Sequence, residues 1–194
     1  MTRIISGFAG SLTLAVPGTG TRPTSERVRE AIFSALDARG SLDGARVADL
    51  YAGSGALGLE SASRGAASVV LVENGPAAAK ACRANAALVL KSAPRAGRLT
   101  IETSGQAVGP FLAASGAVWD VVFLDPPYEL GEAELADALA LLAPRLSADA
   151  VVILERSSRS PEPVWPAGLR LDRRKDYGDT TLWWAHPAEA QPDA

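Results

Sequence analysis

From about residue 46 onward, short apolar runs alternate with segments in which apolar residues recur every three or four positions. The short runs are typical of strands buried on both faces of a sheet, and the periodic segments are typical of helices. This alternation predicts an α/β fold with a mostly parallel sheet. The expected strands are residues 47–50, 68–73, 99–102, 118–125 and 150–155, and the expected helices are residues 55–64, 76–91, 106–114 and 132–142.

The two ends of the chain depart from this pattern. Residues 169–175 and 180–185 flank Tyr177-Gly178-Asp179 and predict an antiparallel hairpin that completes the sheet. Residues 3–6 and 12–16 predict a second hairpin, followed by a helix with Val28, Ile32 and Leu36 on its apolar side. Thr24 or Ser25 would cap this helix, and its other face carries Glu26, Arg27 and Arg29, for which a solvated face is the default interpretation. We therefore expect an N-terminal extension (1–40), a main domain (41–186) and a disordered tail (187–194).

Composition narrows the classes of function. The formal net charge is −3 and the pI about 5.3, which argues against a generic polyanion binder. The chain has one cysteine, Cys82, and one histidine, His186, so no metal site is expected. No apolar run is long enough for a membrane span, and glycines interrupt the weakly signal-like residues 4–16. These features predict a cytoplasmic protein without a membrane or metal partner.

The strand at residues 118–125 ends in a polar, rigid turn, Asp125-Pro126-Pro127-Tyr128. Proline has a fixed φ and no N–H, so this segment neither continues the strand nor enters a helix interior. It offers acceptors, the Asp125 carboxylate and the Pro126 carbonyl, beside the Tyr128 ring. It also lies at the sheet edge where open α/β folds bind ligands. This set suits a planar group with an exocyclic amine, such as a nucleobase.

A glycine-rich loop follows the first strand of the main domain. The spacing Gly53-x-Gly55-x-x-Gly58, with Glu73 at the end of the next strand, fits a nucleoside cofactor whose ribose hydroxyls donate to Glu73. The same spacing is found in NAD-binding proteins. Asp49, at the end of the first strand, favours S-adenosylmethionine, because that cofactor carries an ammonium group and NAD does not. The D-P-P-Y turn also has no role in hydride transfer.

With both motifs placed, the chain resembles the bacterial 16S rRNA guanine-N2 methyltransferases of the RsmD type over roughly residues 1–185. The resemblance rests on residues 3–7, 22–30, 49–60, Glu73, Asn85, 125–128 and 175–180. It implies a class I, Rossmann-like methyltransferase sheet of seven strands, mostly parallel with a C-terminal antiparallel hairpin. It also implies S-adenosylmethionine as cofactor and guanine 966 of 16S rRNA as target. The main domain would be catalytic, and the extension would face the RNA.

The resemblance also implies roles for individual residues. The catalytic set would be Asp125, Pro126, Pro127 and Tyr128. The cofactor set would be Asp49, Tyr51, Gly53, Ser54, Gly55, Glu73, Asn74, Gln106 and Asp125. Gln106 stands where an Asp or Asn often contacts the adenine amine. A separate charge argument gives the RNA-binding set. The first 36 residues, the N-terminal arm, contain four arginines against Glu26 and Glu30, a balance of +2, so Arg22, Thr24, Arg27 and Arg29 are expected to contact RNA.

Several alternatives share part of this pattern. N6-adenine and N4-cytosine DNA methyltransferases also carry D-P-P-Y, but they usually add a target-recognition segment for which this chain has no room. Protein glutamine methyltransferases usually have Asn in place of Asp125. A non-catalytic RNA-binding assembly factor would not need an intact D-P-P-Y and glycine loop. Because the chain is acidic and the hairpin segment 9–14 contains no Lys or Arg, we expect the substrate to be rRNA within a partly assembled small subunit.

Overall fold

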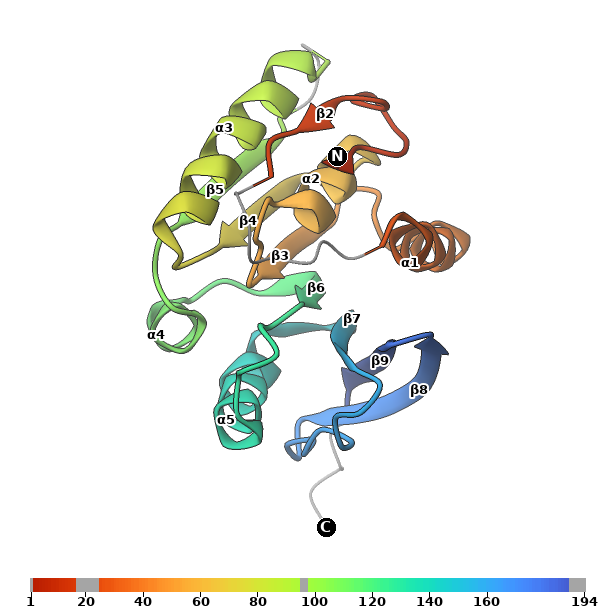
Figure 1. Ribbon diagram of the computed structural model, residues 1–194, viewed down its shortest axis with the longest axis vertical. Coiled ribbons are helices and arrows are strands. Elements are labelled where there is room, and N and C mark those ends of the chain that lie inside the picture. Colours follow the sequence, from red (N-terminus) through yellow and green to blue (C-terminus); the bar gives the residue numbers. More distant parts are fainter. Residues whose placement is uncertain (1, 17–24, 95–97, 189–194) are drawn as a thin grey trace.

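The computed structural model describes residues 2–16, 25–94 and 98–188, and its central element is a seven-stranded sheet (Figure 1). The strand order is β5-β4-β3-β6-β7-β9-β8. Strands β3 to β7 are parallel, whereas β9 pairs antiparallel with both β7 and β8. The predicted sheet is therefore confirmed. Its strands are β3 (Arg46–Leu50), β4 (Ser68–Val72), β5 (Thr100–Ser104), β6 (Trp119–Leu124), β7 (Leu146–Ser157), β8 (Leu169–Tyr177) and β9 (Thr180–Pro187).

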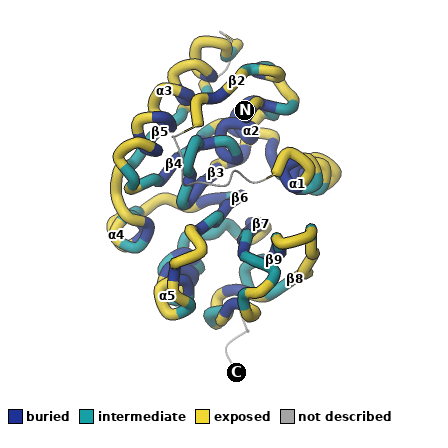
Figure 2. Tube along the Cα trace, viewed as in Figure 1, coloured by how far each residue is buried: buried dark blue, intermediate teal, exposed yellow. Residues whose placement is uncertain are grey.

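Helices cover both faces of the sheet, as the continuous apolar strands predict. In β6, Val121 and Phe123 belong to one hydrophobic core, and Val122 and Leu124 belong to the other. The central strands are buried, whereas the outer faces of the helices are exposed (Figure 2). The first core contains α1 (Glu26–Ala38), α2 (Ala56–Ser63) and α3 (Pro76–Ser92), and the second contains α4 (Val108–Ala114) and α5 (Glu132–Leu142), which a short 3-10 turn, η1 (Ala143–Arg145), follows.

The N-terminal hairpin packs closely on α2. Its paired strands, β1 (Thr2–Arg3) and β2 (Thr13–Leu14), are shorter than expected. The Ser63 hydroxyl accepts from the Ala9 N–H at 2.9 Å and donates to the Ser6 carbonyl at 2.6 Å. Gly7 has a φ of +82°, and a Cβ there would lie 1.8 Å from the Ser63 carbonyl oxygen. Only glycine therefore allows the hairpin to approach α2 this closely.

A buried carboxylate attaches the same hairpin to the main domain. Both oxygens of Glu60, on α2, accept from backbone N–H groups, Ile5 at 2.6 Å and Ser6 at 3.0 Å. Glu60 also accepts from Arg64 at 2.7 Å. Ile4, in the hairpin, and helix α1 contribute to the core that lies under β3 and β4. The extension and the main domain thus share one core, and the division at residue 40 stays a prediction.

Some local predictions need correction or fall outside the described residues. Strand β7 begins at Leu146, four residues before the predicted start at residue 150. Pro187 belongs to β9, and the Ala188 N–H donates to the Gly168 carbonyl, so the predicted disordered tail does not start at 187. Residues 189–194 lie outside the described part of the chain. The Ser25 hydroxyl caps α1 by accepting from the Val28 N–H at 3.2 Å. Within residues 2–16, 25–94 and 98–188, no helix has both the length and the apolar character of a membrane span.

Candidate functional site

The glycine loop connects β3 to α2 and has the geometry that its sequence predicts. Gly55 precedes α2 with a φ of +79°, in the left-handed region. Cys82, from α3, supports the loop by donating its thiol hydrogen to the Gly53 carbonyl at 3.1 Å. Burial raises the pKa of this thiol to about 12, so Cys82 is a packing residue rather than a nucleophile. The contact with α3 therefore supports the loop, and Gly53 and Ser54 line a cavity at the carboxyl edge of the sheet.

Tyr51, at the start of this loop, adopts a backbone conformation that is rare for a bulky residue. Its φ is +63°. Left-handed backbone at a non-glycine residue costs on the order of 1 kcal/mol and occurs most often at functional sites. The side chain lines the cavity, and burial raises its pKa to about 12, so the phenol is neutral at physiological pH. The surrounding structure must therefore hold Tyr51 in this conformation, in the turn that precedes the glycines.

Asp49 is a buried carboxyl group at the end of β3. It is 1% exposed, and its Oδ2 accepts from the Gly58 N–H at 2.8 Å. Burial raises its pKa to about 8, an effect that the Gly58 hydrogen bond opposes and that Asp125 and Glu73 increase. A cationic group of a ligand would relieve this destabilisation of the charged form. Asp49 is thus placed to bind an ammonium group.

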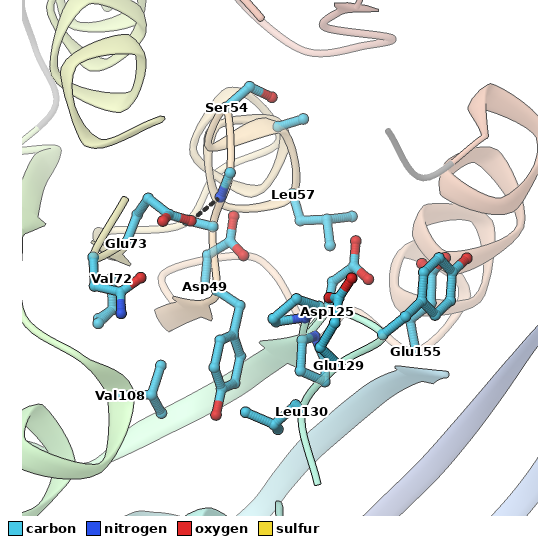
Figure 3. Close-up of a pocket in the computed structure, with 18 of the residues that line it drawn as sticks. Asp49, Ser54, Leu57, Val72, Glu73, Val108, Asp125, Glu129, Leu130 and Glu155 are labelled. Atoms are coloured by element: carbon cyan, nitrogen blue, oxygen red, sulfur yellow. Dashed lines mark hydrogen bonds between the residues drawn. The ribbon is translucent and has the colours of Figure 1, made fainter. Parts of the chain in front are cut away.

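Glu73 lies directly after β4, and backbone donors fix both of its carboxylate oxygens. Oε2 accepts from the Gly53 N–H at 2.9 Å (Figure 3), and Oε1 accepts from the Gly75 N–H at 2.7 Å. Each carboxylate oxygen has a further lone pair. Glu73 can therefore accept from the hydroxyls of a ribose while it holds the glycine loop in place.

Replacing Glu73 by alanine should weaken S-adenosylmethionine binding by about 1.5–3 kcal/mol, because a charged acceptor for the ribose is lost. Calorimetric titration of the cofactor measures the effect, and Glu162→Ala is the matched control, since Glu162 is an exposed loop residue outside the cavity lining. Thermal denaturation of the unliganded proteins shows how much of the change comes from the loop itself. An unchanged Kd in Glu73→Ala would leave this carboxylate with a structural role only.

The D-P-P-Y turn leaves the sheet next to the glycine loop, because β6 and β3 are neighbours. The Asp125 N–H still reaches the Leu50 carbonyl at 3.4 Å, which is the last contact between these two strands. Beyond it, Pro126 is buried and Pro127 is exposed. Tyr128 is 60% exposed, so its ring is available at the rim of the cavity. The turn therefore offers acceptors inside the cavity and an aromatic surface at its rim.

A single cavity of about 520 Å³ joins the two motifs at the carboxyl edge of the sheet. Asp49 lies between Glu73 on one side and Asp125 on the other (Figure 3). The volume is suited to a small-molecule ligand. Of the predicted cofactor and catalytic residues, those that line it are Asp49, Tyr51, Gly53, Ser54, Glu73, Asn74, Gln106, Asp125, Pro126, Pro127 and Tyr128, whereas Gly55 does not.

The cavity residues fit S-adenosylmethionine. Glu73 and Asn74 directly follow β4, Gln106 lies just before α4, and Val108 is the first residue of α4. All four line the cavity, so polar groups and an apolar side chain occur together in its wall. This end suits an adenosine, with acceptors for the ribose and an apolar contact for the base. Asp49 and the loop suit the amino acid part of the cofactor. Among the described residues, no group of three or more His, Cys, Asp or Glu side chains could hold a metal ion.

Sequence reasoning missed three residues that line the other end of the cavity, Glu155, Tyr177 and Thr180. Glu155 lies on β7 and the other two flank the turn between β8 and β9. Glu155 could have been found from the rule that ligands bind beyond the carboxyl ends of parallel strands. Tyr177 and Thr180 belong to segment 175–180, on which the family resemblance partly rests. They are far from the two motifs in sequence, so no local pattern indicates that they share a cavity with them.

Asn85, on α3, connects the N-terminal arm to the glycine loop. It is fully buried. Its side-chain amide donates to the Ala15 carbonyl at 2.9 Å and to the Ser54 carbonyl at 2.8 Å, and it accepts from the Ala15 N–H at 2.8 Å. These bonds bring the segment that leads into residues 17–24 to the cavity.

The predicted RNA-binding residues do not share one environment. Arg29 is 3% exposed, so the expectation of a solvated face is wrong for this residue, although Arg27 is exposed. The Arg29 side chain donates to the Arg3 carbonyl at 3.0 Å and lines the cavity, and its buried Nε has no hydrogen-bond partner among the described residues. Burial lowers its pKa, an effect that Glu60 opposes most strongly. Arg22 and Thr24 lie outside the described residues.

Comparisons with known proteins agree with this site. The family described as "Conserved hypothetical protein 95" matches residues 2–186. The chain is 35% identical over 196 residues to "Ribosomal RNA small subunit methyltransferase D" of Escherichia coli strain K12, covering 99% of this chain and 93% of the relative. The solved structure of yhhF from Escherichia coli is 32% identical, with a TM-score of 0.80 and coverage of 96% and 97%.

A more distant structure shares the fold. Magnesium protoporphyrin IX methyltransferase from Synechocystis, solved with bound S-adenosylmethionine, is 18% identical, with a TM-score of 0.64 and 87% coverage of both chains. The predicted cofactor thus agrees with the fold and with the residues of the cavity. The chain therefore belongs to the "Conserved hypothetical protein 95" family, the RsmD family of class I, S-adenosylmethionine-dependent methyltransferases that its motifs predict.

Proposed function

We propose that this protein transfers a methyl group from S-adenosylmethionine to the exocyclic N2 amine of a guanine in 16S rRNA. The observation that carries this is the single cavity in which the D-P-P-Y turn adjoins the cofactor residues Asp49 and Glu73. Support for the RNA comes from the family, since the relatives include a protein named for methylation of small-subunit rRNA. The target position that the resemblance implies, guanine 966, belongs to the same proposal, as does a cytoplasmic location.

The chain supplies position and electrostatics, while the bound cofactor supplies the electrophilic methyl group. Asp125 and the Pro126 carbonyl accept from the two N–H bonds of the guanine amine. This directs the nitrogen lone pair away from the ring and toward the cofactor end of the cavity. The N–C bond forms as the S–C bond breaks, and the amine then loses one proton to water. No side-chain nucleophile is required.

The target base must leave its stack to enter a cavity at the strand ends. Tyr128 is exposed at the rim and can stack on the extruded base, which is worth about 1–3 kcal/mol. Arg29 lines the same cavity, so its side chain borders the space that the base would enter. The N-terminal arm, with Arg22, Thr24, Arg27 and Arg29, would then border the RNA.

The deciding experiment is methyl transfer from labelled S-adenosylmethionine to 16S rRNA from a strain that lacks the enzyme, followed by mapping of the modified nucleotide. A modified guanine N2 supports the proposal. Transfer to a DNA duplex at adenine N6 or cytosine N4 would favour the DNA methyltransferase alternative. Cofactor binding without transfer to either substrate would favour a non-catalytic assembly factor.

The same assay defines the form of the substrate. We expect faster transfer to partly assembled small subunits than to deproteinised 16S rRNA, because an acidic chain gains little from bare phosphates and its surface is complementary to basic ribosomal proteins. Equal or faster modification of the naked RNA would contradict this preference without affecting the assigned reaction.

A further inference from the structure

Strand β8 carries a concentration of positive charge that is absent from the chain as a whole. Its sequence contains four cations, Arg170, Arg173, Arg174 and Lys175, against two carboxylates, Asp172 and Asp176. The whole chain has a formal net charge of −3. β8 is the last strand of the sheet, and all four cations are exposed. The edge of the sheet therefore presents a basic surface on an acidic protein.

Three of these cations lie on one face and lead to the cavity. Arg170, Arg173 and Lys175 pair with His186, Trp184 and Leu182 of β9, and the last two belong to the core that contains α1. We call these three residues the basic strip. β8 runs in the same direction as the parallel strands, so its end at Tyr177 reaches the carboxyl edge, where Tyr177 lines the cavity. The strip thus extends about 16 Å along β8, from the carboxyl edge toward the start of the strand.

Aromatic side chains hold two of the three strip cations in position. The Arg173 guanidinium carbon lies 4.3 Å from the centre of the Trp184 ring, and the Lys175 nitrogen lies 5.2 Å from the centre of the Tyr177 ring. A guanidinium stacked on a ring keeps its N–H groups at its edge available for bidentate bonds to phosphate. Because the ring already orders the side chain, less entropy is lost on binding.

The neighbouring charges leave the strip positive. Asp172 accepts from Arg39, at the end of α1, at 3.3 Å and lies 3.5 Å from His186. Asp176 accepts from Arg174 at 3.1 Å and also from the Thr181 hydroxyl. Each carboxylate is thus bonded to an arginine outside the strip.

We propose, resting on the RNA substrate proposed above, that the basic strip binds the phosphodiester backbone of the RNA strand that leads out of the cavity. The target nucleotide enters beside Tyr177 and Thr180, and the adjoining phosphates follow Lys175, Arg173 and Arg170 along the sheet edge. This is a second RNA contact, on the edge strand β8, which is far in sequence from the contact proposed for the N-terminal arm. Charged residues on an edge strand also prevent pairing between sheets of different molecules, so the experiment must separate the two roles.

The test compares Arg173→Gln/Lys175→Gln with Lys91→Gln/Arg98→Gln. Both double variants remove two exposed cations, but Lys91 and Arg98 lie at the end of α3 and before β5, outside the cavity lining. Arg170→Gln/Lys175→Gln is a second strip variant that leaves the Arg173–Trp184 contact intact. The measurements are the Kd of 16S rRNA at several salt concentrations, KM and kcat for methyl transfer to it, and the Kd of S-adenosylmethionine.

Both strip variants should bind rRNA roughly tenfold more weakly at low salt, and the slope of log K against log salt should become shallower by about 1.4–1.8. KM for rRNA should rise while kcat and the cofactor Kd stay unchanged. Wild-type values in both strip variants, or an equal change in the α3 control, would overturn the inference. An oligomeric state that is the same in the strip variants and the wild type excludes edge pairing as the cause of weaker binding.

Failure of the strip and failure of the proposed function give different results. If the wild type methylates rRNA and the strip variants do so with unchanged KM and salt slope, the inference is wrong and the function stands. If the wild type methylates no rRNA, the function is wrong. In that case the salt dependence of rRNA binding alone decides whether the strip contacts phosphates. Equal slopes in the wild type and the strip variants would show that it does not.

Discussion

Replacing Asp125 by alanine is expected to lower kcat for methyl transfer to rRNA by about a hundredfold or more, with little change in the Kd of S-adenosylmethionine. The carboxylate stands at the end of β6, beside the cofactor loop, and is the charged acceptor of the D-P-P-Y turn. Its loss leaves the guanine amine without the acceptor that aligns its lone pair. Single-turnover transfer and calorimetric titration of the cofactor measure the two quantities separately.

Asp125→Asn is the informative companion of this variant. The amide retains one acceptor of the same size but has no charge, so its kcat should fall between those of the wild type and Asp125→Ala. An alanine variant that binds the cofactor normally and transfers methyl groups at the wild-type rate would show that Asp125 is not part of the catalytic set. A loss of cofactor binding in both variants would move Asp125 to the cofactor set alone.

Replacing Asp49 by asparagine should change cofactor binding and stability in opposite directions. The asparagine oxygen can still accept from the Gly58 N–H, but it cannot pair with an ammonium group as a charge. At pH 7 we expect S-adenosylmethionine to bind about 10–100-fold more weakly, in line with a lost bond to a charged group. The unliganded variant should nevertheless be more stable than the wild type, because folding at pH 7 makes the buried Asp49 take up a proton, whereas asparagine needs neither a proton nor a buried charge.

The stability gain depends on pH in a defined way. The folded-state pKa of Asp49 is raised from 3.8 to about 8, so between these values the folded protein holds a proton that the unfolded chain has lost. Stability from this group is therefore fully present below about pH 4 and decreases as pH rises to about 8, by up to about 1.4 kcal/mol per pH unit.

Urea unfolding of the unliganded proteins between pH 5 and 8 measures this effect. The difference in unfolding free energy between Asp49→Asn and the wild type should grow with pH over this range. A constant difference would mean that Asp49 is ionised in the folded protein throughout, and that its burial does not raise its pKa.

The motifs were readable from the sequence because each is a local pattern at the end of a strand. The position of the glycine loop after β3, of Glu73 after β4 and of D-P-P-Y after β6 follows from apolar runs that stop at a polar residue. Parallel strands bring their carboxyl ends to one edge, so three separate strand ends predict one cavity. Helix α5 was predicted with its observed bounds, 132–142, since its apolar period is uninterrupted.

The predictions that failed concern features set by residues far apart in sequence. Arg29 stands among charged residues that are typical of a solvated helix face, but it is buried. The N-terminal hairpin lies against it, and the Arg3 carbonyl accepts a hydrogen bond from its guanidinium. Strand β7 was predicted too short because residues 146–149 are not continuously apolar. Their place in the sheet comes from pairing with β6, in which Trp119 lies opposite Leu146.

The sequence by itself determined the fold class, the order of the elements and the two motifs of the cavity, because helical and strand periodicity and strand-end residues are local properties of the chain. Only the tertiary structure decided which distant residues meet. It placed the backbone of residues 5 and 6 on Glu60, connected Ala15 to the glycine loop through Asn85, and aligned the cations of β8 with the aromatic residues of β9 and the cavity mouth. These contacts depend on the sheet order and on the packing of the N-terminal arm, which no local pattern specifies.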